Sequence, residues 1–241
     1  MKPKITFEIP PEFKGVTPEP RPANKFIPEW YKKMSLNHTA PEDNPNKVPY
    51  WTQANGPETT LTMKSCVPVL DYLTLGYTIP LWQDLIIQKD LEDNFYFTWG
   101  DGDNPMIQSH ILSQVSGSGL EEKGTNNSVL KLVCPWNFKT PKGYSCFFFS
   151  PKYHSSDIEI LPAIVDTDSQ HEVNFPFILH YDKKEPYLIP VNTPVIQVFP
   201  FKRQDWEMET KVLDPMEKKR RRKRISSFLY RNFRHAKKKF T

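Results

Sequence analysis

Glycine is scarce in this sequence: only 9 of its 241 residues are glycine. Glycine-rich loops that cradle phosphates, as in P-loop and dinucleotide-binding folds, need several glycines close together. Proline, by contrast, is abundant at 24 residues, which favours extended segments and rigid turns. The composition therefore argues against a doubly wound nucleotide-binding fold.

Cysteine is scarcer still. The chain has three, Cys66, Cys134 and Cys146, an odd number without C-x-x-C spacing. Disulfide frameworks and paired metal-binding motifs need even numbers or short spacings. Because each cysteine lies in a strand-like apolar context, we expect free, mostly buried thiols in a reducing compartment.

The sequence also lacks long apolar runs and common catalytic motifs. No apolar run is long enough to span a bilayer and the N-terminus has no signal-peptide core, so we expect a soluble, cytoplasmic protein. No G-x-S-x-G motif for nucleophilic catalysis occurs. No histidine pair has H-x-H spacing, so we expect no metal site, with a cupin-like small-molecule binder as an alternative if histidines converge in space. The histidines concerned are His110, His154, His171 and His180.

Charge is unevenly distributed along the chain. The chain has 32 Lys and Arg against 28 Asp and Glu, and residues 216–241 hold twelve of the bases with one acid, so the remainder carries a net charge of −7. An acidic body with a basic tail is typical of a protein that uses the tail for interaction. We predict a basic amphipathic helix or tail over 207–241, ordered on a partner. Its apolar positions at near-helical spacing are Ile225, Phe228, Leu229 and Phe233.

Between the two ends, short β-branched and aromatic runs alternate with Pro, Gly, Asn and Asp, a pattern typical of antiparallel strands joined by tight turns. In the clearest stretch, 139–203, we predict a turn at 140–143, strands at 144–149 and 173–180, an acidic turn at 166–168, and a turn and strand over 189–201. Further strands are expected over 61–90 with turns at 67–68 and 79–80, and over 94–98 and 129–134, while 107–115 fits a strand or a short helix. The aromatic content of 13% indicates that Phe, Tyr and Trp supply much of the core volume.

The first 60 residues hold eleven of the prolines and little apolar periodicity. We expect them to form an extended arm that wraps over its own domain or over a neighbouring subunit. One short helix is predicted within the arm at 28–34, with Pro28 in its first turn and Trp30 and Tyr31 as anchors.

The acidic turn Asp166-Thr167-Asp168 joins two apolar strands. A carboxylate placed there has two interpretations. It binds a sugar hydroxyl, activates water or holds a divalent metal, or it bonds to its own backbone as turn residues commonly do.

The order of motifs resembles the trimeric dUTPase and dCTP deaminase superfamily, which has a β-clip jelly-roll fold. The segments that carry the resemblance are Gly76-Tyr77-Thr78-Ile79, Pro141-Lys142-Gly143-Tyr144, Ala163 to Asp168, and Asn192 to Gln197. The resemblance implies that Asp166 activates water and binds the sugar, and that Tyr144 and Asp168 lie near the base or sugar. Gln197 lies on the strand that closes the barrel, where it either contacts the ligand or has a structural role. Nucleotide hydrolysis needs Mg²⁺ and further carboxylates, with Asp84 as the nearest candidate. The sequence departs from the superfamily where Ser150-Pro151-Lys152-Tyr153 replaces the arginine-serine phosphate-binding segment, and where a basic tail replaces the glycine-rich arm.

The chain more specifically resembles an uncharacterised family from bacteria and tailed phages. The shared features are Pro28 to Tyr31, Trp136 to Tyr144, Val165 to Phe177 and Thr193 to Phe201. This resemblance implies a host-cytoplasmic or virion-associated protein and brings no known activity.

The sequence as a whole predicts an all-β protein: a jelly-roll or β-clip barrel over 61–206, with a proline-rich arm at 1–60 and a basic tail at 207–241. We expect a non-enzymatic, phage-type protein that assembles or binds nucleic acid through its tail. We also expect a homo-oligomer, which would be a trimer if the domain is a β-clip. Another anionic partner, or no specific partner, are alternatives for the tail, and a diverged nucleotide hydrolase using Asp166 is the alternative for the domain. The nucleic-acid-binding candidates are Lys218, Lys219, Arg220, Arg221, Arg222, Lys223, Arg224, Arg231 and Arg234.

Overall fold

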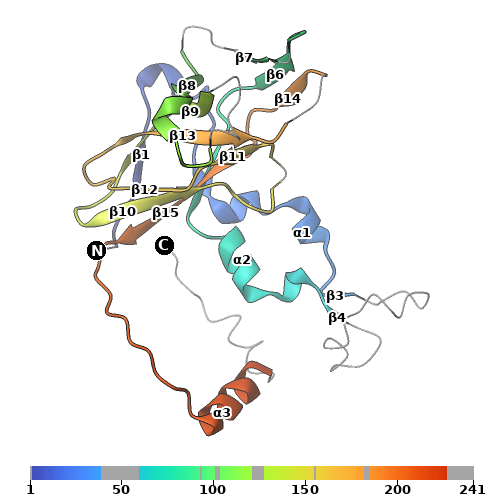
Figure 1. Cartoon of the computed structure of the whole chain (residues 1–241), viewed down its shortest axis with the longest axis vertical. Coiled ribbons are helices and arrows are strands. Elements are labelled where there is room, and N and C mark those ends of the chain that lie inside the picture. Colours follow the sequence, from blue (N-terminus) through green and yellow to red (C-terminus); the bar gives the residue numbers. More distant parts are fainter. Residues whose placement is uncertain are drawn as a thin grey trace. The chain divides into compact units, whose positions relative to one another are not determined.

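A computed structural model describes residues 2–38, 60–92, 94–100, 104–120, 128–154, 156–181 and 185–226. The chain divides into two units, the first formed by Met1–Met34 with Tyr72–Lys202 and the second by Ser35–Asp71 with Arg203–Thr241. The first unit carries the three larger β-sheets (Figure 1). In the part of the chain that the structure describes, no helix is both long and apolar enough to cross a membrane.

Two five-stranded sheets, A and B, form most of the first unit. Sheet A has the order β1 (Thr6–Glu8), β9 (Ser128–Lys139), β13 (Glu172–Leu179) and β11 (Ile158–Ile160), with β8 (Ile107–Ile111) also paired to β9. Sheet B has the order β12 (Ala163–Val165), β10 (Tyr144–Phe149), β15 (Pro194–Lys202), β5 (Tyr77–Pro80) and β2 (Arg21–Pro22). Every neighbouring pair is antiparallel.

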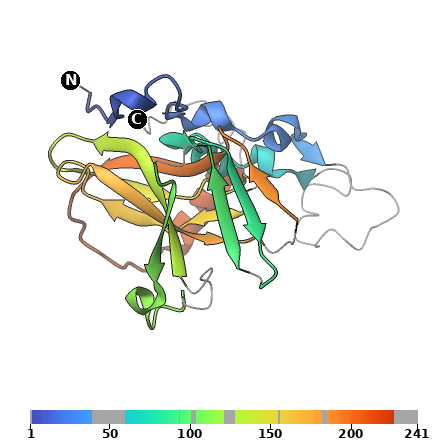
Figure 2. The ribbon, with the colours of Figure 1, turned by 90° about the horizontal axis from the view of Figure 1, so that it is seen from above.

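A third sheet has the order β14 (Tyr187–Ile189), β6 (Leu85–Lys89) and β7 (Phe95–Trp99). The β6–β7 hairpin is drawn in green in Figure 2. The remaining elements of this unit are short: the 3-10 helices η1 (Pro11–Phe13), η2 (Ala23–Phe26) and η6 (Leu112–Val115), and the helix α1 (Glu29–Lys33). The predicted helix at 28–34 is therefore confirmed, and 107–115 holds both a strand and a helical turn.

The core of the first unit is aromatic and joins sheets A and B. Phe138 of β9 meets Phe148 of β10 edge to face, with ring centroids 5.0 Å apart. Phe175 of β13 lies 5.2 Å from Phe148, and all three side chains are fully buried. Each such aromatic pair stabilises the fold by roughly 0.5–1.5 kcal/mol in addition to the free energy gained from burying its surface. Aromatic side chains thus hold the two sheets together.

The all-β prediction is confirmed, but the described strands form no closed barrel. Each sheet ends in strands paired on one side only, such as β12 and β2 in sheet B. The arm expected over 1–60 supplies two edge strands, since β1 pairs with β9 and β2 with β5. The jelly-roll form stays a prediction.

The second unit contains a two-stranded sheet of β3 (Asn37–His38) and β4 (Thr60–Leu61), the 3-10 helix η5 (Met63–Ser65) and the helix α3 (Pro215–Ser226). The helix α2 (Val67–Leu73) runs across the boundary between the units. The predicted strands with a turn at 67–68 are therefore wrong. Pro68 lies in the first turn of α2, where the missing backbone N–H costs nothing, so the proline begins a helix instead of ending a strand.

Candidate functional site

The acidic turn lies between β12 and β13, as predicted, and its backbone is closed by local hydrogen bonds. The Asp166 carbonyl accepts from the N–H groups of Ser169 at 2.9 Å and Gln170 at 2.8 Å. The Thr167 N–H donates to the Val165 carbonyl at 3.0 Å. The turn is thus a compact element whose three side chains point to other partners.

All three side chains bind the hairpin around 140–146. The Ser145 hydroxyl donates to Asp166 Oδ1 at 2.6 Å, and the Gly143 N–H donates to Asp168 Oδ2 at 2.7 Å. The buried Thr167 hydroxyl lies 2.8 Å from that of Thr140. Hydrogen bonds to a carboxylate are stronger than neutral ones. The two aspartates therefore fasten the turn to the hairpin.

Strand register separates the predicted ligand-binding residues into two groups. Tyr144 lies beside the acidic turn and pairs with Lys202, whereas Gln197 pairs with Phe149 at the other end of β10. Five residues of a strand span roughly 17 Å. The structure thus places Asp166 and Asp168 against the two chain neighbours of Tyr144, Ser145 and Gly143, and leaves Gln197 apart.

Gln197 is buried and holds the end of α2. Its side-chain Nε2 donates to the carbonyls of Tyr72 at 3.0 Å and Leu75 at 2.8 Å. Carbonyls at a helix C-terminus have no partner inside the helix, and a buried amide supplies one. One sequence signal could have indicated this role: Gln197 lies within an apolar strand, and a buried amide side chain needs hydrogen-bond partners.

No three His, Cys, Asp or Glu side chains gather as metal ligands within the described ranges. The histidines have separate surroundings: His171 Nδ1 lies 3.1 Å from the Phe138 carbonyl, and His180 Nε2 lies 2.6 Å from Glu159 Oε2. Asp84, the further carboxylate expected from the sequence, belongs to no such cluster of described residues. Its Oδ1 accepts a hydrogen bond from the Val191 N–H at 2.7 Å. This hydrogen bond gives Asp84 a positioning role in the loop before β6.

The three cysteines are free thiols. Cys146 is buried on β10, and Cys134 is partly buried on β9. Burial raises the pKa of the Cys134 thiol to about 12 and that of Cys146 to about 11. Cys66 is exposed, so its predicted burial is wrong: it ends a 3-10 helix instead of lying in a strand. None of the described surroundings of Cys134 and Cys146 favours a thiolate nucleophile.

The basic tail begins as a well-capped helix, α3. Asp214 Oδ1 accepts from the Met216 N–H at 3.0 Å, Pro215 opens the first turn, and Glu217 follows as an acid in that turn. Asp as N-cap, Pro at the first position and an acid nearby are each favourable at a helix N-terminus. Glu217 also forms an ion pair with Arg221 one turn later. The local sequence thus suffices to begin this helix.

Seven consecutive bases, Lys218 to Arg224, follow the cap. Residues 215–221 are all exposed. At about 100° per residue, consecutive bases point to every side of a helix. Arg231 and Arg234 lie outside the described residues.

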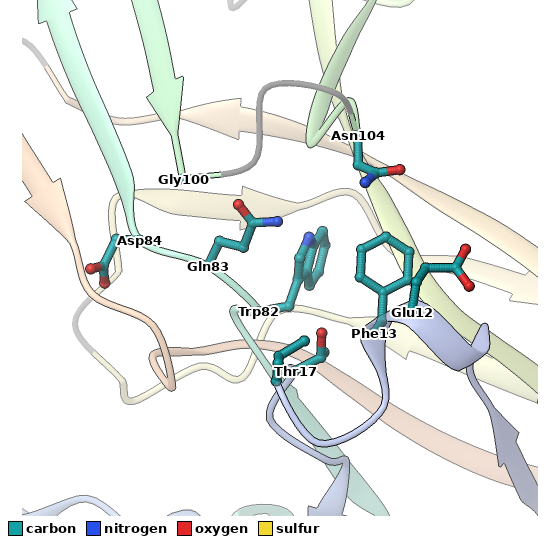
Figure 3. A pocket seen from close by; sticks show the side chains of 9 residues that line it. Glu12, Phe13, Thr17, Trp82, Gln83, Asp84, Gly100 and Asn104 are labelled. Carbon is teal, nitrogen blue, oxygen red and sulfur yellow. The ribbon is translucent and has the colours of Figure 1, made fainter.

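A pocket of about 370 Å³ lies in the first unit and was missed by the sequence analysis. One wall comes from η1 and the turn after it, another from the segment between β5 and β6, and a third from the end of β7. Its lining residues are Glu12, Phe13, Val16, Thr17, Trp82, Gln83, Asp84, Gly100 and Asn104. Figure 3 shows Trp82 between the side chains of Gln83 and Phe13, with Thr17 below it. Only folding brings these distant segments together.

No known protein-family model matches the chain, and no curated protein matches it significantly.

Proposed function

We propose that this is a non-enzymatic binding protein that engages a polyanion, specifically nucleic acid, through α3. The observation that carries the proposal is the run Lys218 to Arg224 on a capped helix whose described side chains are exposed. Lys and Arg neutralise backbone phosphates and release counterions, which drives binding without reading sequence.

The length of the basic run fits a nucleic-acid backbone. Seven helical residues span about 10 Å, and a duplex carries one negative charge per roughly 1.7 Å, or about six over that distance. The basic run carries six net positive charges over the same length, because Glu217 offsets one of the seven bases. Outside residues 216–241 the net charge is −7, so electrostatic attraction is concentrated in the tail. Binding should therefore be salt-sensitive and tolerant of sequence.

The test is fluorescence anisotropy of the full chain with a labelled duplex over a salt series. The binding constant K falls as salt rises, so the slope of log K against log salt is negative. Replacing Arg220, Arg221 and Arg222 by Gln should make this slope shallower by about 2.7, since each phosphate contact contributes roughly 0.9. Gln has nearly the same helix propensity as Arg, so α3 should persist. A single-stranded oligonucleotide and heparin distinguish nucleic acid from other polyanions.

The matched control replaces Lys2, Lys4 and Lys14 by Gln. These three lysines are exposed in the first unit and change the net charge equally. The control should keep the wild-type slope. Equal slopes for the two triple variants, or heparin binding without nucleic-acid binding, would reject the proposal.

A nucleotide hydrolase that uses Asp166 is less well supported. The Asp166 carboxylate accepts a hydrogen bond from Ser145, and Gln197 is separated from it along the sheet. A triphosphate also needs a clamp of cationic side chains and N–H groups. Release of pyrophosphate from dUTP with Mg²⁺, abolished by Asp166→Asn, would restore this function.

The jelly-roll or β-clip form, the phage-type family and a homo-oligomer are further parts of the proposal. The motif order supports the family and, through the β-clip resemblance, the trimer. The antiparallel sheets A and B are compatible with the jelly-roll or β-clip form. Light scattering coupled to size-exclusion chromatography measures the oligomeric state. A monomer at all concentrations would contradict the expected trimer.

A further inference from the structure

The pocket of the first unit has the size of a small-molecule site. Its volume of about 370 Å³ equals that of roughly twelve water molecules, and ligand pockets commonly begin at about 300 Å³. Its walls come from segments far apart in the sequence. The Phe13 carbonyl accepts from the Thr17 N–H at 3.1 Å, and the Trp99 indole donates to the Asn104 carbonyl at 3.0 Å. Hydrogen bonds thus fix two of the walls.

The lining combines aromatic rings with acids. Phe13 and Trp82 supply the rings, while Glu12 and Asp84 lie on opposite sides of the pocket (Figure 3). None of the nine lining residues is Lys or Arg. Among the described lining residues, a phosphate or carboxylate ligand would therefore meet two acids and no base.

We propose that this pocket binds a small organic cation, an ammonium group with a short apolar body. Aromatic rings attract ammonium groups through their quadrupoles. Trp82 is only 4% exposed, so the half-buried Phe13 ring supplies most of the accessible aromatic surface. The carboxylates of Glu12 and Asp84 point outward from the two rings (Figure 3), so they attract a cation toward the pocket at longer range without contacting it there. Gln83 and Asn104 add two polar residues to the lining.

Choline is the probe, and 3,3-dimethylbutan-1-ol, its neutral isostere of the same shape, is the ligand control. Binding to the full chain is measured by isothermal titration calorimetry and by saturation-transfer NMR. Choline should bind at least about five-fold more tightly than the isostere, since the charge is the only difference between them. Glucose serves as a neutral polyol.

Two variants separate the parts of the site. Phe13→Leu removes a ring but keeps apolar volume on a half-buried side chain, and should weaken choline binding about two- to five-fold. Glu12→Gln removes one exposed charge and should weaken it by up to about five-fold. Glu19→Gln, an exposed acid outside the pocket, should leave binding unchanged.

Three results would overturn the proposal: equal affinity for choline and its isostere, preference for glucose, or no binding of choline. Equal weakening of choline binding by Glu12→Gln and Glu19→Gln would also overturn it, because the net charge of the protein would then explain the attraction without a site. Nucleic-acid binding by α3 is measured separately, so the two proposals stand or fall independently.

Discussion

Replacing Gly76 by Ala should destabilise the first unit more than the same replacement of a glycine that has open space around it. Gly76 has φ +64°, and an added Cβ would lie 2.1 Å from the Val198 carbonyl oxygen. The left-handed conformation costs a side chain roughly 1–2 kcal/mol. Val198 pairs with Tyr77 across β15 and β5, so moving its carbonyl disturbs ladder hydrogen bonds worth about 1 kcal/mol each. We expect a total loss of about 3 kcal/mol in the free energy of unfolding.

Gly143→Ala is the matched control. Gly143 has φ +84°, but an added Cβ would meet nothing within 4 Å. It should therefore lose only the conformational cost, roughly 1–2 kcal/mol. The entropic gain of Gly→Ala in the unfolded chain is common to both variants and cancels in their difference.

The assay is urea denaturation followed by tryptophan fluorescence, with circular dichroism to verify that both variants fold. Gly76→Ala should show the lower midpoint at an unchanged m-value. Equal midpoints would refute the reasoning, because they would mean that the close approach to Val198 carries no energy.

Three further outcomes are expected. Only Cys66 should react rapidly with DTNB in the native protein, because burial raises the pKa of the Cys134 and Cys146 thiols; rapid reaction of all three would contradict this. Burial lowers the pKa of His154 below its ordinary value of 6.5, so the folded state binds fewer protons than the unfolded state, and stability should fall as pH drops below about 6.5. Denaturation midpoints from pH 5 to 8 should show this loss, and His154→Gln should lessen it. The buried indole N–H of Trp136 has no hydrogen-bond partner among the described residues, which costs about 1–3 kcal/mol. Trp136→Phe removes this donor, which should offset the packing that the smaller ring loses, so the unfolding free energy should change by less than about 1 kcal/mol. A loss above about 3 kcal/mol would contradict this offset.

Most strands were predictable because their signals are local. The run Tyr144–Phe149 is aromatic and is bounded by Thr140-Pro141-Lys142-Gly143 and by Ser150-Pro151, which are typical of turns. Helix α3 was predictable for the same reason, since Asp214, Pro215 and Glu217 suit a helix start. The error at 67–73 arose because Pro68 is compatible both with a turn and with the first turn of a helix. Only packing decides between them.

The sequence by itself determined the class of the fold, the acidic turn and the separation of charge between body and tail. These follow from short-range periodicity, turn chemistry and composition, which act within a few residues. The tertiary structure alone decided that Asp166 and Asp168 bind Ser145 and Gly143, and that Gln197 lies apart from them. It also decided that segments around Phe13, Trp82 and Asn104 enclose one pocket. Those relations depend on strand register and long-range packing, which no local pattern encodes.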